Sequence, residues 1–222
     1  MTLYHGSGKI VTTPAFGVGN LLNDYGLGFY CTESLELAKE WACSENNDGF
    51  ANRYELDMTN LSVLRLNEGS YHILNWLAIL LENRRFDIVS PISRDARDYI
   101  LEHFLPDYRG YDIITGYRAD DSYFSFSRAF LENGISLSQL SRAMKLGKLG
   151  EQVVLKSEKA FKHISFEEAV PVKGAVYYPK KADRDLKARR DFFDMRKEPQ
   201  AEGEYFMLDI LRQKWTNDDP RI

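Results

Sequence analysis

The chain has 222 residues, of which 44% are hydrophobic and 13% aromatic, so it can bury the core of one domain of ordinary size. A formal net charge of −4 provides no general attraction to nucleic acid, and no apolar run is long enough to span a membrane. Because the N-terminus also lacks a basic segment followed by an apolar one, we expect a cytoplasmic protein with no membrane partner.

The two cysteines, Cys31 and Cys43, are too few for a disulfide framework or for the three or four ligands of a usual metal site. We therefore expect reduced thiols and no bound metal.

The apolar pattern and the turn residues predict strands and helices in the first half of the chain. A strand is expected over 2–5, followed by a loop over 8–25 that is rich in Gly, Pro and Asn. Leu37, Ala38 and Trp41 recur at helical spacing and predict a helix over 34–43 that Ser34 caps. The remaining predicted elements of this half are strands over 53–58 and 61–66, joined by a tight turn, and a helix over 70–83 capped by Ser70.

The second half of the chain adds helices and then further strands. Helices are predicted over 94–105, 122–132 and 137–146, and strands over 111–115, 152–156, 162–166 and 174–178. After Pro179 the chain is charged and predicted to be largely helical. Strands at both ends with helices between them favour an α+β fold with an antiparallel or mixed sheet.

Residues 180–197, KKADRDLKARRDFFDMRK, are the one basic stretch that could contact nucleic acid. Acidic residues alternate with the basic ones, a pattern that favours a solvated helix face.

Two glycine-flanked motifs near the N-terminus contain candidate binding residues. LYHGS at 3–7 places His5 beside Gly6 and Ser7, and GLGFYCTES at 26–34 places Tyr30 just after Gly28. Glycine lets the backbone approach a ligand closely, and a tyrosine ring can stack on a flat heterocycle. Each motif alone also fits an ordinary structural role.

The order of these motifs is informative, because LYHGS is followed by the long loop, then by GLGFYCTES and LAKEWA. This arrangement resembles the N-terminal half of the ADP-ribosyltransferase superfamily, in its histidine–tyrosine class. That class includes diphtheria toxin and the poly-ADP-ribose polymerases. The chain also resembles an uncharacterised bacterial ADP-ribosyltransferase-like family through Asn83-Arg84, YRADDSY at 117–123 and GEQVVLKS at 150–157. The resemblance spans about residues 2 to 166. It implies an ADP-ribosyltransferase-like domain over 1–178, with split mixed or antiparallel sheets and a helical insertion between early and late strands. A charged, mostly helical extension over 179–222 would pack on the same domain.

This resemblance implies that NAD is bound in a cleft of the split sheet and consumed as a substrate, with the bond between nicotinamide and ribose broken. His5 would hydrogen-bond the adenosine-side ribose, while the Gly6 backbone would bind the nicotinamide amide and Ser7 would assist. Tyr30 would form the platform for nicotinamide, and Gly28 would let the chain pass near NAD.

The third position of the class is usually a glutamate at the start of a late strand, and here Glu151 and Gln152 are adjacent at that place. Because neighbouring strand residues point to opposite faces, only one of them can enter the cleft. An inward Glu151 could act as a base, whereas an inward Gln152 could orient a hydroxyl but could not ionise. The sequence leaves both alternatives open, together with the possibility that both are the exposed start of a core strand.

Further contacts with NAD are expected from a small set of polar side chains. Thr32 would contribute a hydroxyl, and Asp120 or Asp121 would provide a base or a ribose contact, although Asp121 could instead cap the following helix. Arg84 and Arg118 could contact the pyrophosphate, because a guanidinium forms two charge-assisted bonds to such a group.

The leading functional hypothesis is a mono-ADP-ribosyltransferase that modifies a macromolecule, with a protein acceptor favoured over nucleic acid by the acidic charge. Its role would be that of a bacterial intracellular toxin in a toxin–antitoxin or phage-conflict system, in which an antitoxin protein would be a partner. The alternatives are an NAD glycohydrolase and a catalytically silent module that binds a nucleotide or a partner protein.

Overall fold

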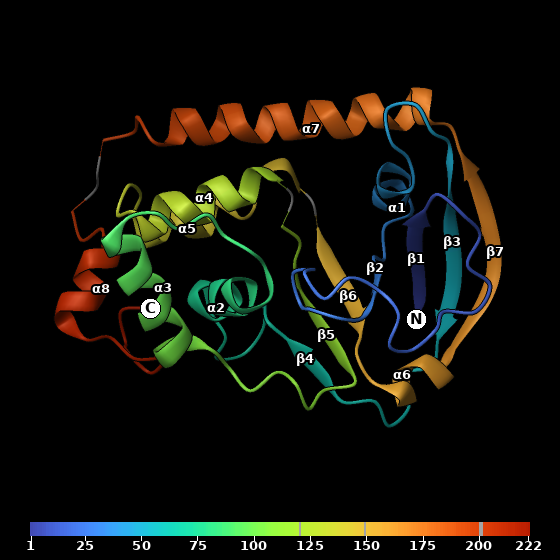
Figure 1. The fold of residues 1–222 in the computed structure, drawn as a ribbon, viewed down its shortest axis with the longest axis horizontal. Helices are drawn as coiled ribbons and strands as arrows, with labels where there is room; N and C mark the ends of the chain where they lie inside the picture. Colours follow the sequence, from blue (N-terminus) through green and yellow to red (C-terminus); the bar gives the residue numbers. More distant parts are fainter. Residues whose placement is uncertain (120, 149, 200–201) are drawn as a thin grey trace.

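The computed structural model of the chain describes residues 1–119, 121–148, 150–199 and 202–222. Two β-sheets lie next to each other, a group of helices packs on one side of them, and a long helix crosses the top (Figure 1). This arrangement confirms the prediction of an α+β fold with antiparallel and mixed sheets.

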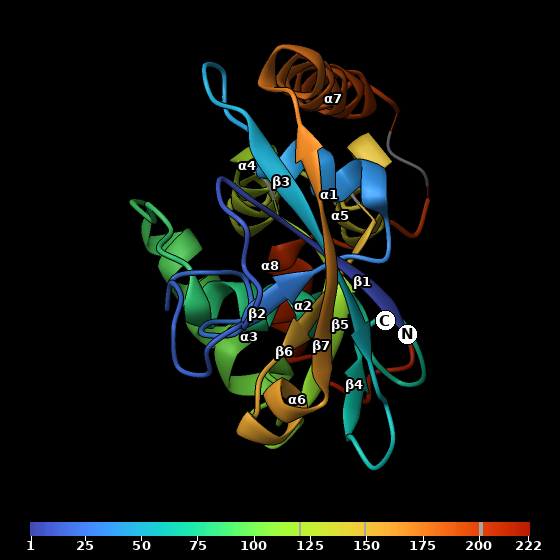
Figure 2. The same cartoon turned by 90° about the vertical axis from the view of Figure 1, so that its right-hand side faces the viewer.

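The first sheet has three antiparallel strands, β1 (Thr2–Ser7), β3 (Gly49–Leu56) and β7 (Ile164–Val172), in the order β1-β3-β7. Helix α1 (Leu35–Ala42) packs on β1, as Figure 2 shows. The Ser34 side chain accepts a hydrogen bond from the Leu37 N–H at 3.3 Å, which confirms the predicted cap.

The second sheet has four strands in the order β2-β6-β5-β4, which are β2 (Phe29–Cys31), β6 (Glu151–Leu155), β5 (Ile113–Tyr117) and β4 (Val63–Arg65). Strands β4 and β5 are parallel and the other pairs are antiparallel. An isolated bridge joins the two sheets, because the Tyr4 and Thr32 backbones exchange hydrogen bonds of 2.8 and 2.9 Å. Residues next to this bridge on both sheets, His5 on β1 and Tyr30 on β2, line the cleft described below.

The helical group is built around α2 (Ile73–Asn83), whose residues 74–81 are all buried. The surrounding helices are α3 (Pro91–Phe104), α4 (Asp121–Leu131), α5 (Leu137–Ala143) and α8 (Met207–Gln213). A short 3-10 turn, η1 (Leu146–Lys148), precedes β6, and α6 (Glu158–Lys162) connects β6 to β7. No helix in the described ranges is long and apolar enough to cross a lipid bilayer.

The long helix α7 (Gly174–Met195) is attached to both halves of the molecule. On the sheet side, two nitrogens of the Arg184 guanidinium lie 2.7 and 2.9 Å from the buried Glu40 carboxylate on α1. On the helical side, the ring of Phe192 stacks on Phe126 of α4 with centroids 4.1 Å apart. Residue 178, where we expected the main domain to end, therefore lies inside α7.

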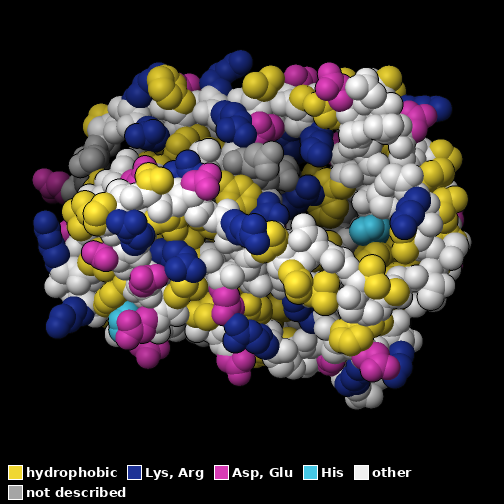
Figure 3. Space-filling model, viewed as in Figure 1, with side chains coloured by type: hydrophobic (Ala, Val, Ile, Leu, Met, Phe, Trp, Pro, Cys, Tyr) yellow, Lys and Arg dark blue, Asp and Glu magenta, His cyan; other side chains and the backbone are white. Residues whose placement is uncertain are grey.

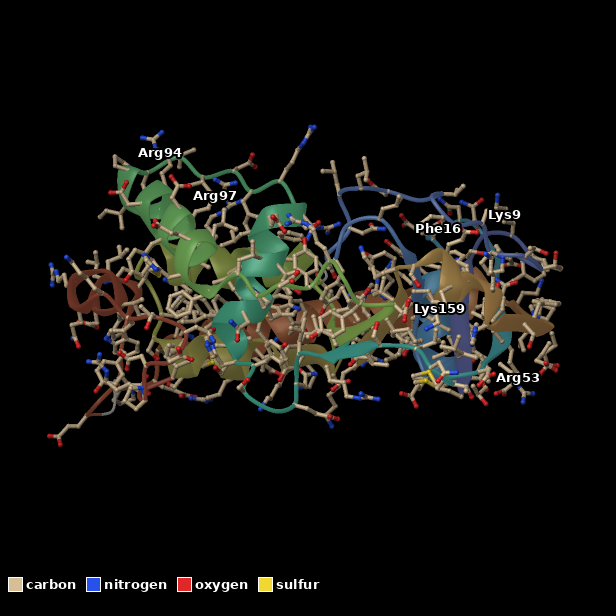
Figure 4. The ribbon with its side chains drawn as sticks, turned by 90° about the horizontal axis from the view of Figure 1, so that it is seen from below. Lys9, Phe16, Arg53, Arg94, Arg97 and Lys159 are labelled. Atoms are coloured by element: carbon tan, nitrogen blue, oxygen red, sulfur yellow. The ribbon has the colours of Figure 1, made fainter. Side chains whose placement is uncertain are left out.

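The loop between β1 and β2 is anchored at its middle. The Phe16 ring packs edge-on against Phe161 of α6, with centroids 5.6 Å apart. Figure 4 shows Lys9 and Phe16 of this loop on the same side of the molecule as Lys159 of α6, with Arg94 of α3 at the opposite end. The loop therefore rests on α6 before it returns to β2.

Several local predictions are wrong. The helix predicted over 70–83 begins at Ile73 and is not capped by Ser70; instead, the His72 N–H donates to the Asn75 side chain at 2.9 Å. Residues 174–178 form the first turns of α7 and no strand, because the Gly174 N–H donates to Asp48 at 2.9 Å where the chain enters the helix. The turn predicted after residue 58 is present, but the strands on its two sides belong to different sheets.

Candidate functional site

A cleft with a volume of about 820 Å³ lies below α7 and is lined by residues of both sheets. Figure 3 shows this face hollowed under α7, with Lys and Arg side chains around the hollow. The volume is within the roughly 300 to 1,000 Å³ of small-molecule and cofactor sites. The residues that line it are His5, Gly6, Asn23, Asp24, Tyr30, Trp41, Arg84, Arg118, Ala119, Gln152, Tyr178, Lys181, Ala182, Asp185 and Leu186.

His5, on β1, connects the two sheets at the floor of the cleft. Its Nδ1 lies 2.8 Å from the backbone oxygen of Tyr30 on β2. Because a carbonyl oxygen only accepts, Nδ1 carries the proton and Nε2 of the neutral ring is an acceptor. Burial lowers the pKa of His5 below its usual 6.5, although the bond to Tyr30 opposes this shift. At neutral pH the cleft therefore contains a neutral imidazole that can accept a hydrogen bond from a ligand hydroxyl.

The hydroxyl of Tyr30 holds the side chain in place through two hydrogen bonds. Its hydroxyl donates to the Gly26 backbone oxygen at 2.5 Å and accepts from the Tyr25 N–H at 3.1 Å. Burial raises the pKa of Tyr30 far above its usual 10, so the phenol stays neutral. The residue therefore offers a fixed aromatic ring and no catalytic base.

The structure distinguishes between Glu151 and Gln152. Gln152 is buried, with 4% of its surface exposed, and lines the cleft. Glu151 is exposed on the other face of β6, where it accepts a hydrogen bond from Asn67 at 2.6 Å. Gln152 is thus the member of the pair that lines the cleft.

Asp24 is a buried carboxylate of the cleft that the sequence analysis did not identify. Its Oδ2 accepts hydrogen bonds from Gln152 Nε2 at 2.7 Å and from the Ala119 N–H at 2.9 Å. Its Oδ1 lies 3.5 Å from Nε of Arg84. Burial raises the pKa of Asp24 above its usual 3.8, while these donors and cations oppose the shift. The one local signal was the position of Asp24 just before the Gly26 turn, within a long loop whose path the sequence does not predict.

The contact with Asp24 fixes the orientation of the Gln152 amide. A carboxylate only accepts hydrogen bonds, so the NH₂ group of Gln152 must point to Asp24 and Oε1 must point away from it. Among the described residues, no donor contacts Oε1. The cleft therefore contains two oriented acceptors for ligand hydroxyls, Gln152 Oε1 and His5 Nε2.

Both predicted arginines line the cleft, but in different environments. Arg84 is paired with Asp24, and its guanidinium also lies 4.5 Å from the centre of the Phe124 ring. Arg118 lies over the Trp41 ring at 4.0 Å from its centre. The positive charge of Arg84 is thus already offset by a buried carboxylate.

Three predicted contact residues do not line the cleft, and their observed contacts are structural. The Ser7 hydroxyl donates within its own loop, and the Thr32 hydroxyl accepts from the Ser34 N–H at 3.2 Å. A Cβ on Gly28 would lie 2.7 Å from Val154 Cγ1, so this glycine is needed for packing on β6. Gly6 does line the cleft, whereas Asp120 and the Asp121 side chain lie outside the described residues.

Among the residues that the structure describes, no group of three or more His, Cys, Asp and Glu side chains is arranged to hold a metal ion. The described cleft presents acceptors, aromatic rings and basic side chains, a combination suited to an organic ligand with hydroxyls and negative charge.

Comparison with known proteins gives a family but no characterised relative. A protein-family model described as "Protein of unknown function (DUF3990)" matches residues 1–166. Neither the curated proteins nor the solved structures contain a match to this chain. The matched region contains His5, Tyr30, Asp24 and Gln152 but ends before α7. Because the match covers more than half of the chain, the protein belongs to the DUF3990 family of proteins of unknown function.

Proposed function

We propose that the chain is a mono-ADP-ribosyltransferase that consumes NAD and modifies a macromolecule. The observation that carries this proposal is that His5, Tyr30 and Gln152, far apart in sequence, line one cleft formed by residues of both sheets. These are the positions, in the same chain order, that the resemblance to the histidine–tyrosine class implies. The division of the strands into two sheets joined at an isolated bridge also supports an ADP-ribosyltransferase-like fold.

Each of these side chains has a task that its geometry suits. Nε2 of His5 would accept a hydrogen bond from the adenosine-side ribose, and the fixed Tyr30 ring would stack on nicotinamide. Oε1 of Gln152 would accept from a hydroxyl of the nicotinamide-side ribose. The ligand would then be held on both sides of the bond that breaks, which is the requirement for a well-oriented reaction.

The reaction breaks the bond between the nicotinamide nitrogen and the ribose carbon. The electron pair leaves with nicotinamide, which becomes neutral, and the ribose passes through an oxocarbenium-like state before the acceptor oxygen or nitrogen bonds to the same carbon and loses its proton. Negative charge near the ribose stabilises this state. Gln152 cannot ionise, and the carboxylate bonded to it is that of Asp24.

The test uses purified protein, NAD labelled in its adenylate half, and a bacterial lysate. Wild-type protein should transfer label to protein, DNA or RNA, with protein as the expected acceptor, and Tyr30→Ala should abolish the transfer. If the target is essential, cytoplasmic expression should also arrest growth for wild type and not for Tyr30→Ala, as the toxin hypothesis requires. Absence of label from every macromolecule would contradict the transferase.

A second candidate is an NAD glycohydrolase, in which water takes the place of the macromolecular acceptor. It is favoured by the position of α7, which forms one wall of the cleft and would limit the space for a bulky acceptor. Free ADP-ribose without labelled macromolecule would identify this activity. The third alternative is a catalytically silent module, which the neutral side chain of Gln152 favours. NAD binding without release of nicotinamide would identify such a module.

A further inference from the structure

Helix α7 contributes a wall to the cleft that the matched family region does not supply. Its five lining residues follow the spacing of one helix face, and they are Tyr178, Lys181, Ala182, Asp185 and Leu186. The family match ends at residue 166, before this helix begins. The bidentate contact of Arg184 with Glu40 and the burial of Ala188 hold α7 against the rest of the molecule. The wall is therefore a fixed part of the site.

Lys181 is the uncompensated cation of this wall. It is half-buried, and no ion-pair partner for it is found among the described residues. In contrast, the neighbouring Lys180 lies 3.8 Å from Glu36, and Asp185, the acidic residue of the same face, is paired with Arg189 at 2.7 Å. The charge of Lys181 is thus directed to the cleft without a counter-charge from α7.

Trp41, on α1, adds a hydrogen-bond donor to the same part of the cleft. Its indole N–H is buried and has no hydrogen-bond partner among the described residues. An indole nitrogen can only donate, and a buried donor without an acceptor is unfavourable. The Arg118 guanidinium lies on the Trp41 ring at 4.0 Å from its centre, so a second cation adjoins this donor.

We propose that Lys181, Arg118 and Trp41 form a phosphate subsite, which makes the C-terminal helix α7 part of the dinucleotide site. The subsite presents two cations and an unsatisfied donor, and a phosphate group supplies several acceptor oxygens with negative charge. The Tyr178 ring provides a surface for a flat base. This inference rests on the proposed function for the identity of the ligand, the pyrophosphate of NAD.

Binding of ADP to purified full-length protein, measured by calorimetry, tests the subsite without any turnover. Lys181→Ala should weaken ADP binding about tenfold, the effect of one charge-assisted hydrogen bond. Trp41→Phe keeps a ring but removes the N–H, and it should weaken ADP binding several-fold. Lys180→Ala is the matched control, because Lys180 is exposed and paired with Glu36, and it should change ADP binding by less than about twofold.

Unchanged ADP affinity in Lys181→Ala would overturn the proposal. If the same variant instead lost affinity only for a single-stranded oligonucleotide, the phosphate would belong to a nucleic-acid acceptor, and the dinucleotide assignment would be wrong. Release of nicotinamide from NAD is measured in parallel. If ADP binding depends on Lys181 but no nicotinamide is released, the proposed function is contradicted and the phosphate subsite is still supported.

Discussion

The Gln152 amide has a single orientation in the cleft because its partner, the Asp24 carboxylate, can only accept hydrogen bonds. In the proposed reaction Asp24 would therefore be a positioning residue, because it holds the NH₂ group of Gln152 and so directs Oε1 away from itself. Arg84 and the Ala119 N–H hold Asp24 in turn. A buried network of this kind has its full effect only when every member is satisfied.

Replacement of Asp24 tests this network. Asp24→Asn keeps the size of the side chain but introduces an NH₂ group, which can donate to Oε1 of Gln152 and reverse its amide. Turnover of NAD should fall roughly tenfold to a hundredfold, the range expected when a reacting group is misplaced by about 1 Å. The measurement is the rate of nicotinamide release, with a thermal melt to verify that the variant is folded.

The pH profile distinguishes this role from a purely structural one. Burial raises the pKa of Asp24, so the wild-type rate should decline as the pH falls through that raised pKa and the carboxyl takes up a proton. His5, whose pKa is lowered, also becomes protonated on the acid side in both proteins. The pH profile of Asp24→Asn should therefore lose the acid-side decline that comes from Asp24 and keep the decline that comes from His5. An unchanged profile with full turnover would show that Asp24 does not position Gln152.

At the residue scale, the sequence allowed His5 and Tyr30 to be singled out as candidates, and both line the cleft, but it did not predict every residue that lines it. The glycines around these two residues give a local pattern, and both line the cleft. The choice between Glu151 and Gln152 depends on the register of β6, in which Gln152 lies opposite Gly116. Asp24 reaches the cleft through a long loop, so a short-range pattern could not place it.

At the scale of elements, the contact between β1 and α1 determines how the cleft is built. A Cβ on Gly6 would lie 2.1 Å from the Ala38 backbone oxygen and 2.7 Å from the Ala42 nitrogen. Backbone atoms of a helix cannot move aside individually, so the whole of α1 would have to shift. The glycine after His5 is therefore explained by packing as well as by its place in the cleft.

A pair of glycine substitutions tests this packing. Gly6→Ala should destabilise the protein by roughly 1 to 3 kcal/mol, which lowers Tm by about 2 to 4 °C per kcal/mol for a chain of this size. Gly8→Ala is the matched control, because a Cβ there would meet no atom within 4 Å. Thermal melts of both variants give the comparison, and equal Tm values for the two would mean that α1 does not pack on β1 as described.

The elements with local signals were predicted best. The cap at Ser34 and the helix that follows the loop need only neighbouring residues, and both are present. The segment 174–178 has valine and tyrosine residues typical of strands. It nevertheless forms the start of α7, because the Gly174 N–H donates to Asp48 and the Asn47 backbone packs closely against Gly174. Such contacts between distant segments override local preference.

At the scale of the whole molecule, the cleft depends on two features that no short segment encodes. One is the division of the strands, in which the segments on either side of the turn at Asn60 enter different sheets. The other is the path of α7, which extends over both halves and supplies Lys181 and Tyr178 to the cleft. The α+β class followed from the order of predicted elements, whereas these two features required the assembled structure.

The most direct test of the central claim is nicotinamide release from NAD by purified wild-type protein, Gln152→Ala and Glu151→Ala. These neighbouring residues lie on opposite faces of β6, with Gln152 in the cleft and Glu151 exposed, so each variant controls for the other. Wild type should release nicotinamide, Gln152→Ala should be at least about tenfold slower, and Glu151→Ala should stay within about twofold of wild type. No release by wild type, or an equal loss in both variants, would contradict the account.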